Sequence, residues 1–152
     1  MKATIIAVGR WKSGPERALF EHYAGRLTPS LELREVEERK KLSTDELKKK
    51  ESELLLASVP KDARVVALDS SGKSMSSPAI AKRLGVWRDG GTRQVAWLIG
   101  GANGHGQAAL KRADLVLSLG SQTWPHLLVR AMLAEQLFRA QSILAGHPYH
   151  RD

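Results

Sequence analysis

The segment Val95–Arg139, VAWLIGGANGHGQAALKRADLVLSLGSQTWPHLLVRAMLAEQLFR, decides the fold of this chain. An apolar run at Val95–Ile99, typical of a buried strand, leads directly into the glycine-rich loop 100–106. A second apolar run, Leu115–Leu119, ends in the loop Gly120–Trp124, and a proline then opens a long helix. Two strands that each end in a loop of small residues and then a helix predict a ligand site at the carboxyl ends of a parallel sheet.

The residues N-terminal to this segment repeat the same alternation of strand and helix. Strands are predicted at Ala3–Val8, Leu31–Val36 and Arg64–Asp69, because these runs are largely apolar and rich in β-branched residues. Helices are predicted between them from capping and proline signals. Their apolar stripes are Leu19, Tyr23 and Leu27 in the first helix, Leu47, Leu54 and Leu55 in the second, and Ile80, Leu84 and Trp87 in the third.

This order of elements predicts an α/β fold with a mostly parallel sheet flanked by helices. The chain is 152 residues long, enough for one domain with a core, so a single domain over 1–152 is expected. No apolar run is long enough to cross a membrane, and the start of the chain is typical of a strand, not of a signal sequence. The absence of cysteine excludes disulfides, thiolate zinc sites and a cysteine nucleophile, and it fits a cytoplasmic protein.

The charge balance favours a polyanionic partner. Lys and Arg number 24 against 16 Asp and Glu, which gives a net charge of +8. A compact basic domain attracts nucleic acid, although general basicity of a soluble protein explains the same number. The charge-dense stretch Glu35–Glu53 has the same two interpretations, a solvated helix face or a surface that follows phosphates.

The loop 100–106 has four glycines in seven residues. Glycine lets the backbone approach a ligand closely and adopt positive φ, so the N–H groups of such a loop can hold an anion or bind the edge of an adenine or ribose. Its pattern, Gly-Gly-x-x-Gly-x-Gly, differs from the dinucleotide fingerprint Gly-x-Gly-x-x-Gly. A purely structural turn before a helix also explains the glycines, and both interpretations stay open.

A second glycine motif is rejected as a phosphate-binding loop. Residues Ser70–Ser74 contain Gly-Lys-Ser, which is half of that motif. The first glycine of the motif would have to stand at position 67, where Ala67 lies inside a predicted strand.

Candidate reactive side chains gather in the C-terminal part of the chain. His126 stands at the start of the long helix, and Glu135 and Arg139 are four residues apart, a spacing that also suits a simple ion pair. The sequence Tyr149-His150-Arg151 could stack on a base and bind a phosphate, or it could be a frayed tail. His147 and His150 have no third ligand at a suitable spacing, so no metal is expected.

Four segments of the chain form a further pattern: ALDSSGK, LIGGANGHG, LSLGSQTWPHLLVRAMLAEQLFRA and the terminal HPYHRD. Together they resemble the RlmH family, the SPOUT-class methyltransferases that modify a pseudouridine in large-subunit ribosomal RNA. The resemblance implies a SPOUT fold with a deep C-terminal trefoil knot, an exception to unknotted topology. It also implies S-adenosylmethionine as cofactor, a homodimer, and methylation at N3 of a pseudouridine in 23S rRNA on the assembled 70S ribosome.

The resemblance assigns roles to particular residues. The implied cofactor pocket consists of Leu68, Gly100, Gly101, Leu119, Gly120, Ser121, Gln122, Thr123 and Trp124. Candidates for assisting loss of the N3 proton are His126, Glu135 and His150. The residues expected to contact RNA are Arg130, Arg139, Tyr149 and Arg151.

Two other classes of function stay open at this point. A dinucleotide-dependent oxidoreductase would need a glycine fingerprint in the first strand–helix turn, where this chain has the poor match Gly9-Arg10-Trp11-Lys12-Ser13-Gly14. A non-catalytic RNA-binding module would explain the charge and the tail, but not the two loops that follow the strands.

Overall fold

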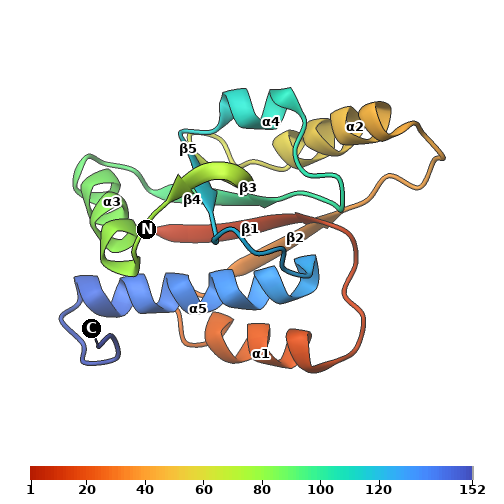
Figure 1. Cartoon of the computed structure of the whole chain (residues 1–152). Coiled ribbons are helices and arrows are strands. Elements are labelled where there is room, and N and C mark those ends of the chain that lie inside the picture. Colours follow the sequence, from red (N-terminus) through yellow and green to blue (C-terminus); the bar gives the residue numbers. More distant parts are fainter. Residues whose placement is uncertain (152) are drawn as a thin grey trace.

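A parallel sheet runs through the computed structural model, which describes residues 1–151; Asp152, the last residue of the HPYHRD motif, lies outside them. Within the described residues the sheet has five strands in the order β2-β1-β4-β3-β5, and every neighbouring pair is parallel (Figure 1). The strands are β1 (Lys2–Val8), β2 (Glu32–Val36), β3 (Arg64–Ser74), β4 (Gln94–Ile99) and β5 (Leu115–Ser118). The predicted α/β class is therefore confirmed.

Helices cover both faces of the sheet, as expected for parallel strands joined by crossovers. Figure 1 shows α1, α3 and α5 on one face and α2 and α4 on the other. The helices are α1 (Pro15–Ala24), α2 (Thr44–Ala57), α3 (Ser77–Asp89), α4 (Gln107–Arg112) and α5 (His126–Leu144). None of the helices within residues 1–151 is both long and apolar enough to span a bilayer.

Strand β4 shows why its sequence is apolar throughout. Val95, Trp97 and Ile99 pack into the core beneath α1, α3 and α5, whereas Ala96 and Leu98 pack on the other face with Leu55 of α2. Successive side chains of a strand point to opposite faces, so a strand covered on both sides must be apolar at every position.

The start of α2 follows the predicted capping signal. The side chain of Ser43 accepts a hydrogen bond from the backbone N–H of Glu46 at 3.3 Å. This bond satisfies one of the four N–H groups that the first turn of a helix leaves unpaired.

The predicted apolar stripe of α1 is wrong at one of its three residues, Leu19. Leu19 is 43% exposed, and the buried residues of the helix are Phe20 and Ala24. Phe20 packs against Trp11, with ring centroids 5.5 Å apart, so the loop before the helix selects the face that turns inward. Tyr23 is half-buried, and Leu27 is buried just beyond the end of the helix.

Strand β3 continues beyond its predicted end at Asp69 to Ser74. Its register against β5 shifts on the way, because Leu68 and Lys73 both pair with Leu117. Gly72 makes this bend possible, since a Cβ at that position would lie 2.7 Å from backbone atoms of Leu117. The motif that suggests a phosphate loop is thus a bent extension of the strand.

Candidate functional site

A cavity of about 580 Å³ opens at the carboxyl ends of β4 and β5, beside the middle of β3. The register brings these segments together, because Leu68 of β3 pairs with Ile99, the last residue of β4, and with Leu117 of β5. All residues of the predicted cofactor pocket line this cavity: Leu68, Gly100, Gly101, Leu119, Gly120, Ser121, Gln122, Thr123 and Trp124. The structure therefore brings together three segments that are far apart in the sequence.

The first wall is the loop 100–106, which folds into a tight turn. The backbone N–H of Gly104 donates to the carbonyl of Gly101 at 3.0 Å, and Gly104 has φ of +79°. A Cβ on Gly100 would lie 3.1 Å from the carbonyl carbon of Gly104. The glycines are needed both for the left-handed conformation and for the close approach of the two backbone segments.

His105 anchors this loop from beneath. Its ring is only 4% exposed, and Nε2 lies 3.2 Å from the carbonyl oxygen of Leu98, whereas Nδ1 has no hydrogen-bond partner among residues 1–151. Burial lowers the pKa of His105, although the Leu98 carbonyl and the negative charge of Asp69 oppose this effect. The neutral ring is thereby favoured.

Asp69, which also lines the cavity, is a carboxylate held ionised. Burial by itself would raise the pKa of Asp69, but hydrogen bonds from the side chain and backbone of Ser71 and the nearby His105 outweigh it, so the pKa is lowered. A carboxylate on β3, just before the bend at Gly72, therefore faces the loop that follows β4.

The second wall is the loop 119–125. Gly120 has φ of +109°, and its N–H donates to the Ser118 hydroxyl at 3.2 Å. The indole N–H of Trp124 donates to the carbonyl of Leu119 at 3.2 Å, so the loop closes on itself. The Trp124 side chain is 39% exposed at the rim.

His126 completes this cavity at the first residue of α5. Its side chain is exposed, and Nε2 is 3.8 Å from the place where a Cβ on Gly9 would stand. The histidine thus lies between the cavity and the loop that follows β1.

Arg130 does not fit its predicted contact with RNA. Its side chain has no exposed surface, and its guanidinium binds Glu35 at 2.7 Å and the carbonyl oxygen of Gly9 at 3.1 Å. The guanidinium also lies 4.6 Å from the centre of the Trp11 ring. The arginine instead fastens α5 to the ends of β1 and β2, a role that the sequence around it did not reveal.

The C-terminal segment is docked, not frayed. The Tyr149 hydroxyl donates to Glu135 at 3.1 Å, and the Tyr149 ring packs edge-on against Phe138. Arg139 binds Glu135 at 2.5 Å and lies over the Tyr149 ring, 4.8 Å from its centre, with its Nη1 3.2 Å from Nδ1 of His150. In this arrangement the Tyr149 ring is engaged within the protein, contrary to the expected stacking on a base.

The same contacts raise the pKa values of Tyr149 and Arg139. The hydrogen bond with Tyr23 raises the pKa of Tyr149 to about 12, and burial and the Glu135 carboxylate act in the same direction. The Glu135 hydrogen bond raises the pKa of Arg139. Glu135 is thus the shared acceptor of a phenol and a guanidinium.

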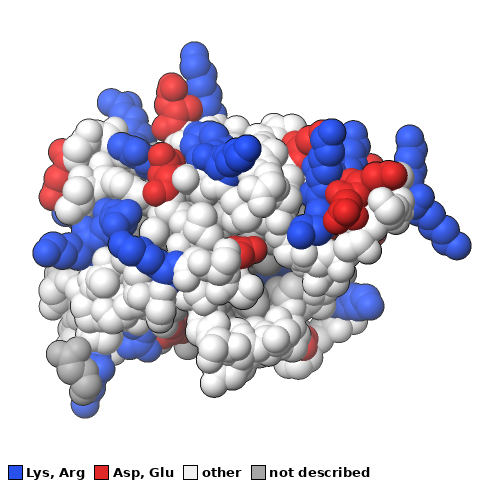
Figure 2. Space-filling model, turned by 45° about the horizontal axis from the view of Figure 1, so that its top comes forward, with Lys and Arg blue, Asp and Glu red and all other residues white. Residues whose placement is uncertain are grey.

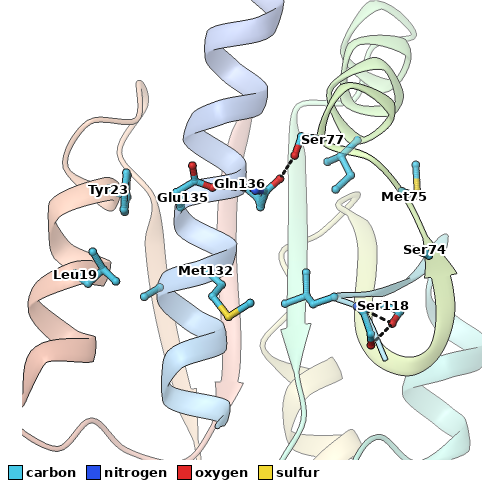
Figure 3. Close-up of a pocket in the computed structure, with 13 residues that line it drawn as sticks. Leu19, Tyr23, Ser74, Met75, Ser77, Ser118, Met132, Glu135 and Gln136 are labelled. Carbon is cyan, nitrogen blue, oxygen red and sulfur yellow. Dashed lines mark hydrogen bonds between the residues drawn. The ribbon is translucent and has the colours of Figure 1, made fainter. Parts of the chain in front are cut away.

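Glu135 lines a second cavity, of about 510 Å³, between α1, α5 and the end of β5. Figure 3 shows Leu19 and Tyr23 of α1 on one side and Ser77 on the other, with Glu135 and Gln136 between them on α5. The Ser77 hydroxyl donates to Gln136 at 2.6 Å, and Gln136 donates to Glu135 at 2.9 Å. Ser118, Leu119 and Gly120 line both cavities, so the two cavities share one wall.

The surface charge is mixed. Figure 2 shows Lys and Arg side chains spread over the face that carries α2 and α4, with Asp and Glu among them. Arg151 is exposed at the C-terminus, and the Arg139 side chain is 24% exposed.

A family model described as "Predicted SPOUT methyltransferase" matches residues 1–150. The chain belongs to the SPOUT methyltransferase family. It is 58% identical over 151 residues to the "Ribosomal RNA large subunit methyltransferase H" of Paramagnetospirillum magneticum, with 99% of each chain covered. It is 54% identical to the protein of the same name from Rhodospirillum rubrum, with 100% of each covered. These matches confirm the resemblance to the RlmH family.

A solved structure described as a probable methylase family protein from Haemophilus influenzae Rd KW20 superposes with a TM-score of 0.55. The sequence identity is 9%, and the match covers 99% of this chain and 70% of the other. This likeness supports the SPOUT fold alone. The trefoil knot stays a prediction.

Two buried titratable side chains of this SPOUT chain could not be recognised as buried from the sequence. His105 stands between two glycines, outside any apolar pattern, and Glu51 lies among the charges of a helix that reads as solvated. Both are at least nine-tenths buried, which only the contact between α2 and the loop 100–106 reveals.

Proposed function

We propose that the protein transfers a methyl group from S-adenosylmethionine to N3 of a pseudouridine in 23S rRNA, on the assembled 70S ribosome. The observation that carries the proposal is the cavity at the carboxyl ends of β4 and β5, beside β3, which every predicted cofactor residue lines. Family membership and the names of the relatives support methyl transfer to large-subunit rRNA.

The cavity suits the chemistry of the methyl donor. Leu68, Leu117 and Trp124 offer apolar walls for an adenine, and the glycine loop brings backbone groups to the surface. A side chain at Gly100 would fill the space between the two arms of its own loop, so the backbone has to line the cavity there. When bound, the donor supplies an electrophilic methyl group.

His126 is the residue we propose to accept the N3 proton. Formation of the new N–C bond requires the nitrogen lone pair, so the proton must leave the base as the methyl group arrives. His126 lines the cavity, whereas Glu135 lies across the shared wall and already accepts bonds from Arg139 and Tyr149. Glu135 and His150 are then left to orient the tail near the acceptor nucleotide.

Exposed apolar side chains beside the two cavities support a homodimer. Leu19 is exposed at its edge, and Trp124 is exposed at the rim of the first cavity, so two large apolar side chains flank the paired cavities. We propose that a second copy covers this face and that its C-terminal segment completes the site. Of the four residues expected to contact RNA, Arg151 is exposed, and Arg139 keeps 24% of its side chain exposed although it binds Glu135, so these are the two that can still meet phosphates.

Calorimetric titration with S-adenosylmethionine, with NAD in parallel, tests the proposal first. Saturable binding of the methyl donor alone is expected, followed by methylation of ribosomes that lack the modification and poor methylation of the isolated stem-loop. Binding of NAD instead would favour an oxidoreductase. Binding of neither would favour an RNA-binding module without catalysis.

A further inference from the structure

Helix α2 packs directly against the loop 100–106. The Ser52 hydroxyl, 1% exposed, accepts a hydrogen bond from the N–H of Gly106 at 2.8 Å. A Cβ on Gly106 would lie 2.9 Å from that hydroxyl and 3.1 Å from the carbonyl oxygen of Lys48. The loop therefore rests directly on the helix, with no room for a side chain between them.

Glu51 makes the second contact between α2 and this loop. A Cβ on Gly101 would lie 2.9 Å from Oε2, 3.1 Å from Oε1 and 3.3 Å from Cδ of Glu51. The carboxyl group thus packs against the α-carbon of Gly101. Glu51 is not among the residues that line the 580 Å³ cavity, but Gly101 is, so the contact with Gly101 is a direct route by which Glu51 can act on a ligand there.

The carboxyl group of Glu51 is unusual in this place. The side chain is 8% exposed, and Oε1 has no hydrogen-bond partner within residues 1–151. Burial raises the pKa of Glu51, which favours the neutral acid. Burying an unpaired polar atom lowers stability, so the needs of the fold alone would favour an apolar side chain here.

We propose that Glu51 is a positioning residue for methyl-donor binding, which fixes Gly101 while Ser52 fixes Gly106. This proposal rests on the proposed function, since it assumes that the cavity holds the methyl donor. The turn from Gly101 to Gly104 is closed by one internal hydrogen bond. His105 ties the end of the loop to Leu98 of β4, whereas Gly101 and Gly106 are held by the contacts with α2. A helix of 14 residues gives that support a rigid base.

The first experiment measures amide hydrogen exchange of the loop in the protein without ligand. We expect E51A to speed exchange across 100–106 by about tenfold or more, because local opening becomes easier when a contact is removed. E51Q, which keeps the shape of the side chain, should restore slow exchange. L55A is the matched control: it removes a fully buried side chain of the same helix on the core side, and it should lower the melting temperature without speeding loop exchange.

The second experiment measures the dissociation constant for S-adenosylmethionine in the same variants. E51A should raise it about tenfold, E51Q should stay within about twofold of the parent, and L55A should also stay within about twofold. The double variant E51A/G101A should bind better than G101A alone, since the added methyl group no longer meets the carboxyl. Where E51A does not fold, E51D withdraws the same carboxyl by one methylene and should show a smaller effect in the same direction.

The outcomes separate the two proposals. Unchanged loop exchange in E51A, or equal effects of E51A and L55A, would overturn the role of Glu51 whatever the protein binds. Fast loop exchange in E51A together with no binding of the donor by the parent protein would keep the support by α2 and reject the proposed function.

Discussion

Arg130 shows how a residue that looks suited to RNA can be needed for the fold. Its guanidinium is enclosed by Trp11, Glu35 and two backbone carbonyls, and it joins α5 to the ends of two strands. Breaking a buried ion pair leaves the remaining partner without compensation. The arginine therefore acts on the site indirectly, by fixing the first turn of α5, where His126 stands.

We expect Arg130→Ala to lower the free energy of unfolding by about 3 kcal/mol, because Glu35 would lose its charged partner. Urea denaturation followed by circular dichroism measures this change. Arg151→Ala is the control on an exposed arginine and should change stability by less than about 0.5 kcal/mol. A loss of similar size in both variants would contradict the structural role.

Tyr149 gives the second prediction at this scale, a pH dependence. Its pKa in the folded protein is about 12 against an ordinary 10.0, and Tyr23 is its strongest partner. A raised pKa means that folding disfavours the phenolate. The resulting contribution to stability is therefore complete below pH 10, the unfolded value, and is lost as the pH rises toward 12.

Absorbance titration of the phenolate should accordingly show a tyrosine that ionises near pH 12 and no longer does so in Tyr149→Phe. The chain has only two tyrosines, so the two transitions can be assigned. The loss of stability between pH 10 and 12 should be smaller in this variant than in the parent. Equal curves for both proteins would show that the tail is not docked in solution.

At the scale of helices and strands, local sequence patterns predicted the elements whose position depends on the burial of a whole segment. The apolar runs around Val65, Trp97 and Leu117 gave the buried strands, and the stripe Ile80, Leu84 and Trp87 gave the inner face of α3, all now seen in the core. The predictions were wrong where a residue or strand distant in the sequence decides which face is buried or where a strand ends. The face of α1 depends on Trp11, and the length of β3 depends on β5.

The candidate site likewise has one part that the sequence predicted and another that it did not. The lining of the first cavity could be predicted because glycine loops after strands must meet at one edge of a parallel sheet. The burial of Glu51, His105 and Arg130 could not, since each is surrounded by atoms from elements remote in sequence. A charged residue on a helix gives no local signal of such an environment.

The bend in β3 makes a prediction at the element scale. Gly72→Ala would place a methyl group 2.7 Å from the backbone of Leu117, and the two strands would have to move apart. Overpacking of this kind lowers stability by about 1–3 kcal/mol. Chemical denaturation measures the loss, with the exposed Ser74→Ala in the same strand as control. A neutral Gly72→Ala would mean that the extension of β3 does not pair with β5 in solution.

At the scale of the whole molecule, the two cavities lie on either side of Leu119 and Gly120, and exposed apolar side chains flank them. If a second copy covers this face, a charge placed at Leu19 must be buried without a partner in the dimer, although it stays solvated in the monomer. Leu19→Glu should therefore weaken dimerisation at least tenfold, a change of about 1.4 kcal/mol, and leave the melting temperature of the monomer unchanged. Sedimentation velocity over a range of concentrations measures the dissociation.

Val86→Glu is the matched control, because Val86 is 60% exposed on α3 and does not line either cavity. It should leave the oligomeric state as it is. Loss of methyl transfer in Leu19→Glu with retained binding of S-adenosylmethionine would place the missing groups on the second copy, as expected if its C-terminal segment completes the site. A Leu19→Glu protein that stays dimeric would require the interface to lie elsewhere, and the second cavity would then be open to the RNA itself.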